Sequence, residues 1–259
     1  RSLFTIILCL LLSCFIYSEL LNTISWHQLK SILIASLLGA LGLICMVSAL
    51  KNGSLRQLGV FNLLTVFITV TYLIIFENLN IKYYLIGSFF ILIGFAFYLF
   101  QIKKNRVAEY SIKQYSLLSL MALFFSSSGL LHWYNLKASI PVIASVLTQE
   151  STVFLIGISM FLFQPKKLII EIVRNSINKI KLVFIMALII FLAILFGFMG
   201  LKITNPLISS LLSLSVPIIT ILFGKIFFKE NLNSNILVSL LLISIGAFLL
   251  YLDLNHFYN

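Results

Sequence analysis

The sequence predicts an all-α integral membrane protein, and two observations carry that prediction. Of its 259 residues, 61% are hydrophobic and only 10% are charged, with a mean hydropathy of +1.13. A soluble domain has roughly 45–50% apolar and about 25% charged residues. The apolar residues also form long uninterrupted runs, unlike the alternating pattern of membrane barrel strands. Helices satisfy their own backbone hydrogen bonds and can therefore cross lipid.

Nine apolar stretches are long enough to cross, because a helix needs about 20 residues to traverse the hydrocarbon core. Breaks at charges, Asn and Pro give the approximate limits 2–21, 31–50, 58–76, 83–100, 115–134, 141–163, 182–201, 207–228 and 236–252. The basic residues fall mainly in the loops between these stretches. We therefore attribute the net charge of +11 to membrane topology and not to a nucleic-acid partner.

The tetrapeptide ENLN closes the third stretch at 77–80 and the eighth at 230–233. The stretches that follow, IKYYLIGSFFILIGFAFYL and SNILVSLLLISIGAFLLYL, both contain Ile-Gly. An odd number of crossings separates the two copies, so the duplicated halves have opposite orientations, as in many secondary transporters. We interpret the chain as nine visible transmembrane helices of a ten-helix inverted repeat, five plus five, whose first helix is missing. The repeats are expected at 1–105 and 106–259.

The two glutamates of the ENLN copies, Glu77 and Glu230, are interpreted as structural turn residues. A polar residue at the membrane surface can end one helix, and Asn80 or Asn233 can cap the next. A carboxylate near the following N-terminus also suits the helix dipole. Direct contact with substrate is the alternative for both glutamates.

Four motifs resemble the drug/metabolite transporter superfamily, whose members are two inverted EamA-type units of five helices. ALKNGSLRQLGVFN (49–62) is similar to W-A-V-N-N-G-x-x-x-x-x-S-L-G-Y-F-I-N-P-L of the RarD-like chloramphenicol-sensitivity permeases. Their G-E-R-L, A-L-A-x-S-F-x-x-Y-G-L-L-R-K and L-T-x-E motifs are similar to ENL (77–79), LMALFFSSSGLLHW (120–133) and LTQE (147–150). The resemblance covers nearly the whole chain and implies a central cavity with alternating access.

Glu150 is the one carboxylate near the middle of an apolar stretch, in IPVIASVLTQESTVFLIG. It also matches the glutamate of the family's L-T-x-E motif. A carboxyl group at the bilayer centre costs at least about 2.5 kcal/mol on insertion scales, so it usually serves a function. We interpret Glu150, with Gln149 beside it, as a group that couples protons or binds a substrate amine. A buried glutamate that only stabilises helix packing is the alternative.

Weaker candidates for substrate contact are polar or aromatic residues at other places in the apolar stretches: Asn62, Ser127, His132, Trp133, Tyr134 and Pro217. The cluster at 132–134 is either an aromatic belt at the interface or a stacking wall for a substrate. The serine either bonds substrate or allows close helix packing. The proline kinks its helix, which frees a carbonyl group. Asn62 lies one position from the place of the family's Asn-Pro, so the motif alone transfers no role to it.

Orientation has two incompatible indications. The positive-inside rule places the loops 101–114 and 164–181 in the cytoplasm and the C-terminus outside. The family resemblance implies that both ends lie in the cytoplasm.

We therefore predict a secondary transporter of a small organic metabolite or drug in the cytoplasmic membrane, driven by protons or by exchange. The expected partners are an amino acid-like, nucleotide-like or drug substrate and the lipid bilayer. No enzymatic activity, metal or cofactor is expected, because the sequence lacks HExxH, Gly-x-Ser-x-Gly and P-loop motifs and its cysteines lack metal spacing. The alternatives are a membrane scaffold or sensor and an enzyme acting on lipid-linked substrates.

Overall fold

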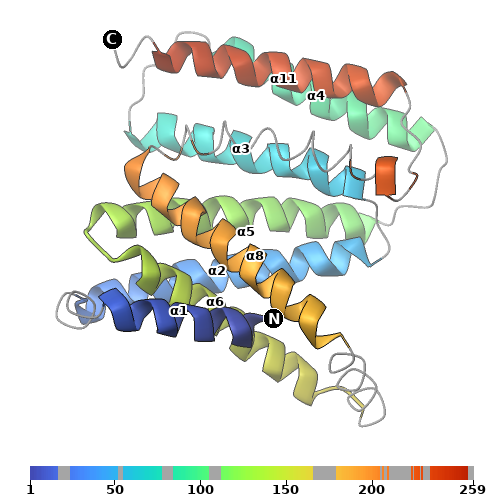
Figure 1. The fold of residues 1–259 in the computed structure, drawn as a ribbon. Coiled ribbons are helices and arrows are strands. Elements are labelled where there is room, and N and C mark those ends of the chain that lie inside the picture. The colour runs from blue at the N-terminus through green and yellow to red at the C-terminus, as the bar shows by residue number, and fades with distance from the viewer. Residues whose placement is uncertain are drawn as a thin grey trace. The chain divides into compact units, whose positions relative to one another are not determined.

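The structure is a computed structural model that describes residues 1–16, 24–51, 55–77, 84–104, 112–165, 179–204 and 234–255, with a few isolated residues between 206 and 229. All regular structure in these ranges is α-helical (Figure 1). The helices are α1 (Ser2–Ile16), α2 (Trp26–Leu50), α3 (Leu55–Glu77), α4 (Tyr84–Lys104), α5 (Ile112–Lys137), α6 (Val142–Leu162), α8 (Ile180–Ile203) and α11 (Ser234–Asn255). The predicted all-helical architecture is thus confirmed for the described part of the chain.

Helices occur at the expected apolar stretches, except that 207–228 lies almost wholly outside the described residues. Among the described helices, four are long and apolar enough to cross a membrane, namely α2, α5, α6 and α8. These helices support a multi-pass membrane protein. The count of nine crossings stays a prediction, as does the missing first helix.

The most apolar of these four helices, α8, exposes many of its large side chains, among them Leu182, Phe184, Ile185 and Ile189. Contiguous exposed apolar surface of this kind is rare in soluble monomers. In a bilayer the same side chains contact lipid, which is as apolar as they are. The exposure is therefore what a membrane-spanning helix requires.

Contacts between residues divide the chain into two compact units. Unit 1 comprises Arg1–Leu41 and Ser127–Asn205, and unit 2 comprises Gly42–Ser126 and Pro206–Asn259. The boundary falls inside both α2 and α5. These units alternate along the chain and are a different division from the sequence repeats, so the repeats at 1–105 and 106–259 stay a prediction.

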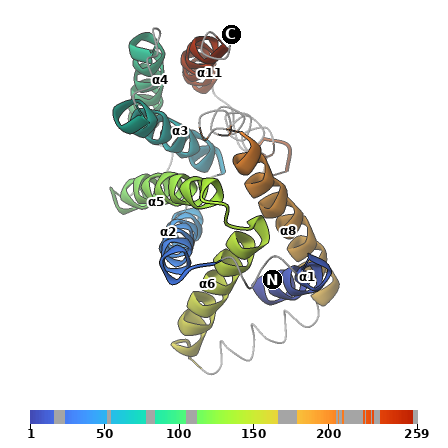
Figure 2. The same cartoon turned by 90° about the vertical axis from the view of Figure 1, so that its left-hand side faces the viewer.

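In unit 1, helices α1, α6 and α8 contact one another (Figures 1 and 2). Their shared core contains Cys9 of α1, Val146 of α6, and Phe191 and Leu195 of α8. A second apolar cluster joins Ile32 of α2 to two residues at and beyond the α5–α6 turn, Ile140 and Ala144. Burial of these side chains holds α2 and α6 together at that level of the unit.

The start of α2 is fixed by reciprocal capping. The backbone N–H of Gln28 donates to Ser25 Oγ (3.3 Å), and the backbone N–H of Ser25 donates to Gln28 Oε1 (2.8 Å), which is the capping-box arrangement. Gln28 Nε2 also donates to the carbonyl oxygen of Ala138 (3.2 Å), in the turn between α5 and α6. This bond connects the beginning of α2 to the end of α5.

In unit 2, the helices α2, α3 and α5 contribute to one apolar cluster of buried residues: Ala49, Leu58, Phe61, Leu118 and Met121. The ring of Phe61 also lies 6.1 Å from that of Tyr115, measured between centroids. This cluster fixes the C-terminal end of α2 against α3.

The helices that follow the two ENLN copies, α4 and α11, lie side by side in unit 2 (Figures 1 and 2). A Cβ atom added to Gly94 of α4 would lie 2.7 Å from Ile243 Cγ1 and 3.0 Å from the carbonyl oxygen of Ser239. A Cβ atom added to Gly246 of α11 would lie 2.5 Å from the carbonyl oxygen of Gly87 and 2.9 Å from Ile91 Cγ1. Glycine is therefore required at both places by close approach of the partner helix.

The two sets of contacts are equivalent under the sequence repeat. Alignment of the two Ile-Gly segments pairs Gly94 with Gly246, and it also pairs the segment 87–91 with 239–243. Each glycine thus contacts the equivalent segment of the other helix. The residue numbers at these contacts rise along α4 while they fall along α11, so the two helices are antiparallel. An inverted repeat predicts this arrangement for these two helices.

Candidate functional site: an ion pair and a buried polar layer

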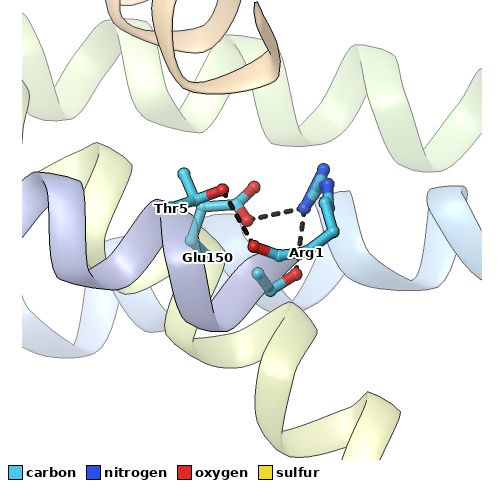
Figure 3. A network of polar contacts seen from close by, with 4 residues as sticks. Arg1, Thr5 and Glu150 are labelled. Atoms are coloured by element: carbon cyan, nitrogen blue, oxygen red, sulfur yellow. Dashed lines mark hydrogen bonds and ion pairs between the residues drawn. The ribbon is translucent and has the colours of Figure 1, made fainter. Parts of the chain in front are cut away.

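Glu150 lies on α6 inside unit 1 and is 1% exposed. Its Oε2 accepts a hydrogen bond from Arg1 Nη1 at 2.6 Å (Figure 3). The same nitrogen of Arg1 donates to Ser2 Oγ at 3.0 Å, and Thr5 Oγ1 donates to the carbonyl oxygen of Arg1 at 3.3 Å. The beginning of α1 therefore supplies the partner of the carboxylate, and Ser2 and Thr5 in turn bond to that partner.

The contact between Arg1 and Glu150 could not be predicted from the sequence. Nothing in the spacing of two residues at positions 1 and 150 indicates a contact, and Arg1 belongs to none of the quoted motifs. The helical period does indicate which face of α6 carries Glu150. Val146 and Glu150 lie one turn apart on the same face, and Val146 packs against Cys9 of α1. The face that carries Glu150 is thus the one that contacts α1.

The neighbouring face of α6 meets α2 and α5 at Gly39. A Cβ atom added to Gly39 would lie 2.9 Å from Ser128 Oγ and 3.7 Å from Gln149 Nε2. Gln149 was predicted beside Glu150 in function. The structure places its half-buried side chain beside Gly39 of α2.

Two hydrogen bonds fix α5 against α2. Ser128 Oγ donates to the carbonyl oxygen of Ala35 at 2.8 Å, and Ser31 Oγ donates to Asn135 Oδ1 at 2.6 Å. His132 lies between Ser128 and Asn135 on α5, about one turn from each, so it shares their face. It is 1% exposed. The histidine is therefore part of the interior of unit 1.

Several polar atoms at this level have no hydrogen-bond partner within the described part of the chain: both ring nitrogens of His132, Ser36 Oγ, Ser145 Oγ and Asn135 Nδ2. Each of these four side chains is at most 5% exposed. An unpaired buried donor or acceptor costs about 1–3 kcal/mol. We refer to Ser36, His132, Asn135 and Ser145 as the polar layer.

The structure separates the predicted cluster at 132–134. The ring of His132 lies 4.6 Å from that of Phe198 on α8. Trp133 is buried, and its ring lies 4.9 Å from Tyr134 and 3.8 Å from the ammonium nitrogen of Lys137. The histidine thus belongs to the polar layer, whereas Trp133 contacts Tyr134 and Lys137 at the end of α5.

The remaining candidates do not join either group. Ser127 is half-buried on α5, and Asn62 is half-buried on α3 in unit 2. Glu77 is exposed at the last position of α3. Pro217 and Glu230 lie outside the described residues, as do the proposed caps Asn80 and Asn233. Their roles stay predictions.

Comparison with known proteins identifies the family. The sequence model of the EamA-like transporter family matches residues 112–252. Because the match spans more than half of the chain, the protein belongs to this family. The family consists of membrane transporters and points away from an enzyme.

The architecture is similar to that of a solved structure described as "Crystal structure of protein". The similarity covers 97% of this chain and 98% of the other, with a TM-score of 0.55 and 13% sequence identity. At that identity the likeness establishes the fold alone. No curated protein matches the sequence.

Proposed function

We propose that this protein is a secondary transporter that moves a small organic molecule across the cytoplasmic membrane by alternating access. Membership of the EamA-like transporter family supports the transport of a solute. The likeness of the segments 49–62, 120–133 and 147–150 to RarD-like permeases supports a metabolite or drug as that solute.

The observation that carries the proposal is the ion pair between the buried Glu150 and the half-buried Arg1. Charged side chains within membrane-spanning helices are expensive and usually mark substrate pathways or proton relays. Here the side chain of Glu150 is 1% exposed and that of Arg1 is 20% exposed, so Arg1 is the more accessible member of the pair.

The hydrogen-bond pattern leaves the pair able to exchange partners. Within the described residues, the bond joins one guanidinium nitrogen, Nη1, to one carboxylate oxygen, Oε2. Arginine and carboxylate groups frequently form two parallel bonds in a fork. A single bond leaves donors of Arg1 available to other groups. A proton or a substrate amine can then replace Arg1 at Glu150.

Protonation of Glu150 provides a coupling step. The neutral carboxylic acid no longer attracts the guanidinium, so the contact between the start of α1 and the middle of α6 weakens. Truncation of one member of a buried pair is strongly destabilising because the other charge remains uncompensated. A proton taken up by Glu150 must therefore be accompanied by rearrangement around Arg1, and that rearrangement is the proposed link to substrate movement.

Counterflow in proteoliposomes tests the transport function. Vesicles containing the purified protein are loaded with an unlabelled metabolite and diluted into the labelled compound, using amino acid-like, nucleotide-like and drug compounds in turn. Saturable counterflow of one class supports the proposal. Absence of counterflow for every class, from protein with a cooperative melting transition, would favour the scaffold alternative.

A further inference from the structure

We infer that an apolar cluster at the α5–α6 turn is a gate above the polar layer of unit 1, and that opening of this gate exposes the polar layer to water. The inference rests on the proposed function, because alternating access requires a gate that opens and closes. Its basis is the order of three layers of side chains from the turn inwards, together with the way in which the neighbouring helices are joined.

The outermost layer is polar. Gln28 Nε2 donates to the carbonyl oxygen of Ala138, which joins the start of α2 to the α5–α6 turn. Ala138 and Ser139 of this turn are exposed. The turn connects two helices that are each long enough to cross a membrane (Figure 1). It therefore lies at a membrane surface, in contact with water.

An apolar layer follows directly beneath the turn. Ile32 of α2, Ile140 and Ala144 of α6 form one buried cluster, and Ile24 packs against it. We refer to these four residues as the plug. Ile32 is fully buried and Ile140 is 2% exposed. The plug therefore closes this end of unit 1 between α2 and α6.

The backbone of the turn fixes Ile140 within the plug. The N–H of Ile140 donates to the carbonyl oxygen of Asn135, and the N–H of Ser139 donates to that of Leu136, both at 3.2 Å. These two bonds form a Schellman motif, in which one residue takes a left-handed conformation. Ser139 is that residue, with φ 65°. Ile140 is therefore held at the end of α5 by main-chain bonds.

The polar layer lies further in than the plug. Ser36 follows Ile32 by four residues on α2, so the two side chains share one face of the helix. Ser145 follows Ala144 directly on α6, which runs inwards from the turn. The two members of the polar layer on α5 precede the turn. The plug thus separates the polar layer from the water at the turn.

The interface between α2 and α6 is the one that opens. Two interhelical hydrogen bonds join α2 to α5. Within the described residues, no hydrogen bond joins α2 to α6, and the plug is their contact near the turn. Helix α6 packs with α1 and α8 around a separate core. Movement of these three helices away from α2 therefore opens the plug and leaves the two α2–α5 bonds intact.

The polar layer stabilises the open state. Its four side chains carry atoms that have no hydrogen-bond partner within the described part of the chain, and unpaired buried groups are costly. Water that enters past the open plug supplies those partners. This gain offsets part of the cost of exposing the plug. The open state is therefore closer in free energy to the closed state than it would be with apolar side chains in the polar layer.

Chemical modification of a cysteine in the polar layer tests the gate. The full chain with Ser145→Cys is incubated in detergent with a water-soluble methanethiosulfonate reagent, and modified cysteines are identified by peptide mass mapping. We expect modification of the thiol group at position 145, because each opening of the plug exposes it. Cys9 is the internal control, since it is fully buried against Val146 in the separate core and should stay unmodified.

Ile32→Ala, added to this variant, should accelerate modification at position 145 by about tenfold or more, because loss of buried methyl and methylene groups destabilises the closed plug. Leu195→Ala is the matched control, because Leu195 lies in the separate core with Cys9. It should not accelerate the reaction. Equal acceleration by both substitutions, with modification of Cys9, would show that the reagent enters through general unfolding and would overturn the inference.

Ser36→Cys replaces Ser145→Cys if the latter lacks a cooperative melting transition. Absence of modification in the folded variant, with and without Ile32→Ala, would also overturn the gate. These results are independent of transport. Modification without counterflow of any compound would reject the transporter proposal alone, whereas counterflow with a protected polar layer would reject the gate alone.

Discussion

Gly94 of α4 lies against residues 239–243 of α11, and Gly246 of α11 lies against residues 87–91 of α4. The sequence repeat aligns these two segments with each other. Gly94 approaches Ser239 and Ile243, and Gly246 approaches Gly87 and Ile91. Small residues let helices approach closely in membranes, where packing replaces the hydrophobic effect as the driving force. The duplicated Ile-Gly thus explains a local two-fold relation between two antiparallel helices.

Substitution of Gly246 by alanine should destabilise unit 2. The added methyl group would meet the backbone carbonyl of Gly87 at 2.5 Å, and backbone cannot rotate away as a flexible side chain does. Overpacking of this kind typically costs about 1–3 kcal/mol. We expect a lower melting temperature for Gly246→Ala, measured by the fluorescence of a thiol-reactive dye in detergent.

Gly157→Ala is the matched control, because a Cβ atom at Gly157 of α6 has no neighbour within 4 Å. Alanine favours helix over glycine by about 1 kcal/mol, so this variant should melt at the same temperature or higher. Equal melting temperatures for the two variants would contradict the close approach of α4 and α11.

The ion pair predicts strong coupling between Arg1 and Glu150. Arg1→Gln leaves the carboxylate buried and unpaired, at a cost of about 3–5 kcal/mol for a buried pair. Addition of Glu150→Gln should restore much of that loss. A double-mutant cycle on unfolding free energies in detergent measures the coupling. Simple additivity of the two losses would show that the residues do not interact.

Ser128→Ala and Ser126→Ala should have different effects although both serines are buried on α5. Ser128 Oγ donates to Ala35 of α2, whereas Ser126 Oγ donates to Leu123 of its own helix at 3.0 Å. Loss of the interhelical bond should cost about 1 kcal/mol. Loss of the local bond should be close to neutral, since such bonds slightly destabilise helices. Equal melting curves would argue against the α2–α5 contact.

Lys137→Gln should change the fluorescence of Trp133, because the ammonium nitrogen lies 3.8 Å from the centre of the indole ring. The variant is best compared in a Trp26→Phe background, which leaves Trp133 as the one indole of the chain. A shifted emission maximum and a loss of about 0.5–1 kcal/mol are expected for an exposed cation–π pair. Lys30→Gln should leave the emission unchanged.

Composition and the length of the apolar runs were sufficient to predict the helical fold. Uninterrupted apolar runs indicate helices, because a helix satisfies its own backbone hydrogen bonds in lipid. The described helices coincide with the expected stretches. The end of α5 was harder to predict, because the continuation through Asn135 to Lys137 is polar. Contacts with α2 through Asn135 stabilise that last turn, and such tertiary contacts do not appear in local sequence.

The site was predicted only in part. A lone glutamate in an apolar stretch indicated a buried charge, and Glu150 is buried. Its partner was not indicated, because a contact between distant positions leaves no local pattern. Ser36 and Ser145 were not predicted to accompany His132, because serine is common in membrane helices. Only the absence of a hydrogen-bond partner within the described residues distinguishes these two hydroxyl groups from those of other serines.

Uptake driven by an imposed pH gradient is the most direct test of the proposed role of Glu150. Proteoliposomes containing the wild-type protein, Glu150→Gln or the control Glu77→Gln are supplied with the compound that gives counterflow. We expect the gradient to drive accumulation by wild type and Glu77→Gln, and we expect Glu150→Gln to retain exchange while losing the response to the gradient. Unchanged gradient-driven accumulation by Glu150→Gln would contradict proton coupling through this carboxylate.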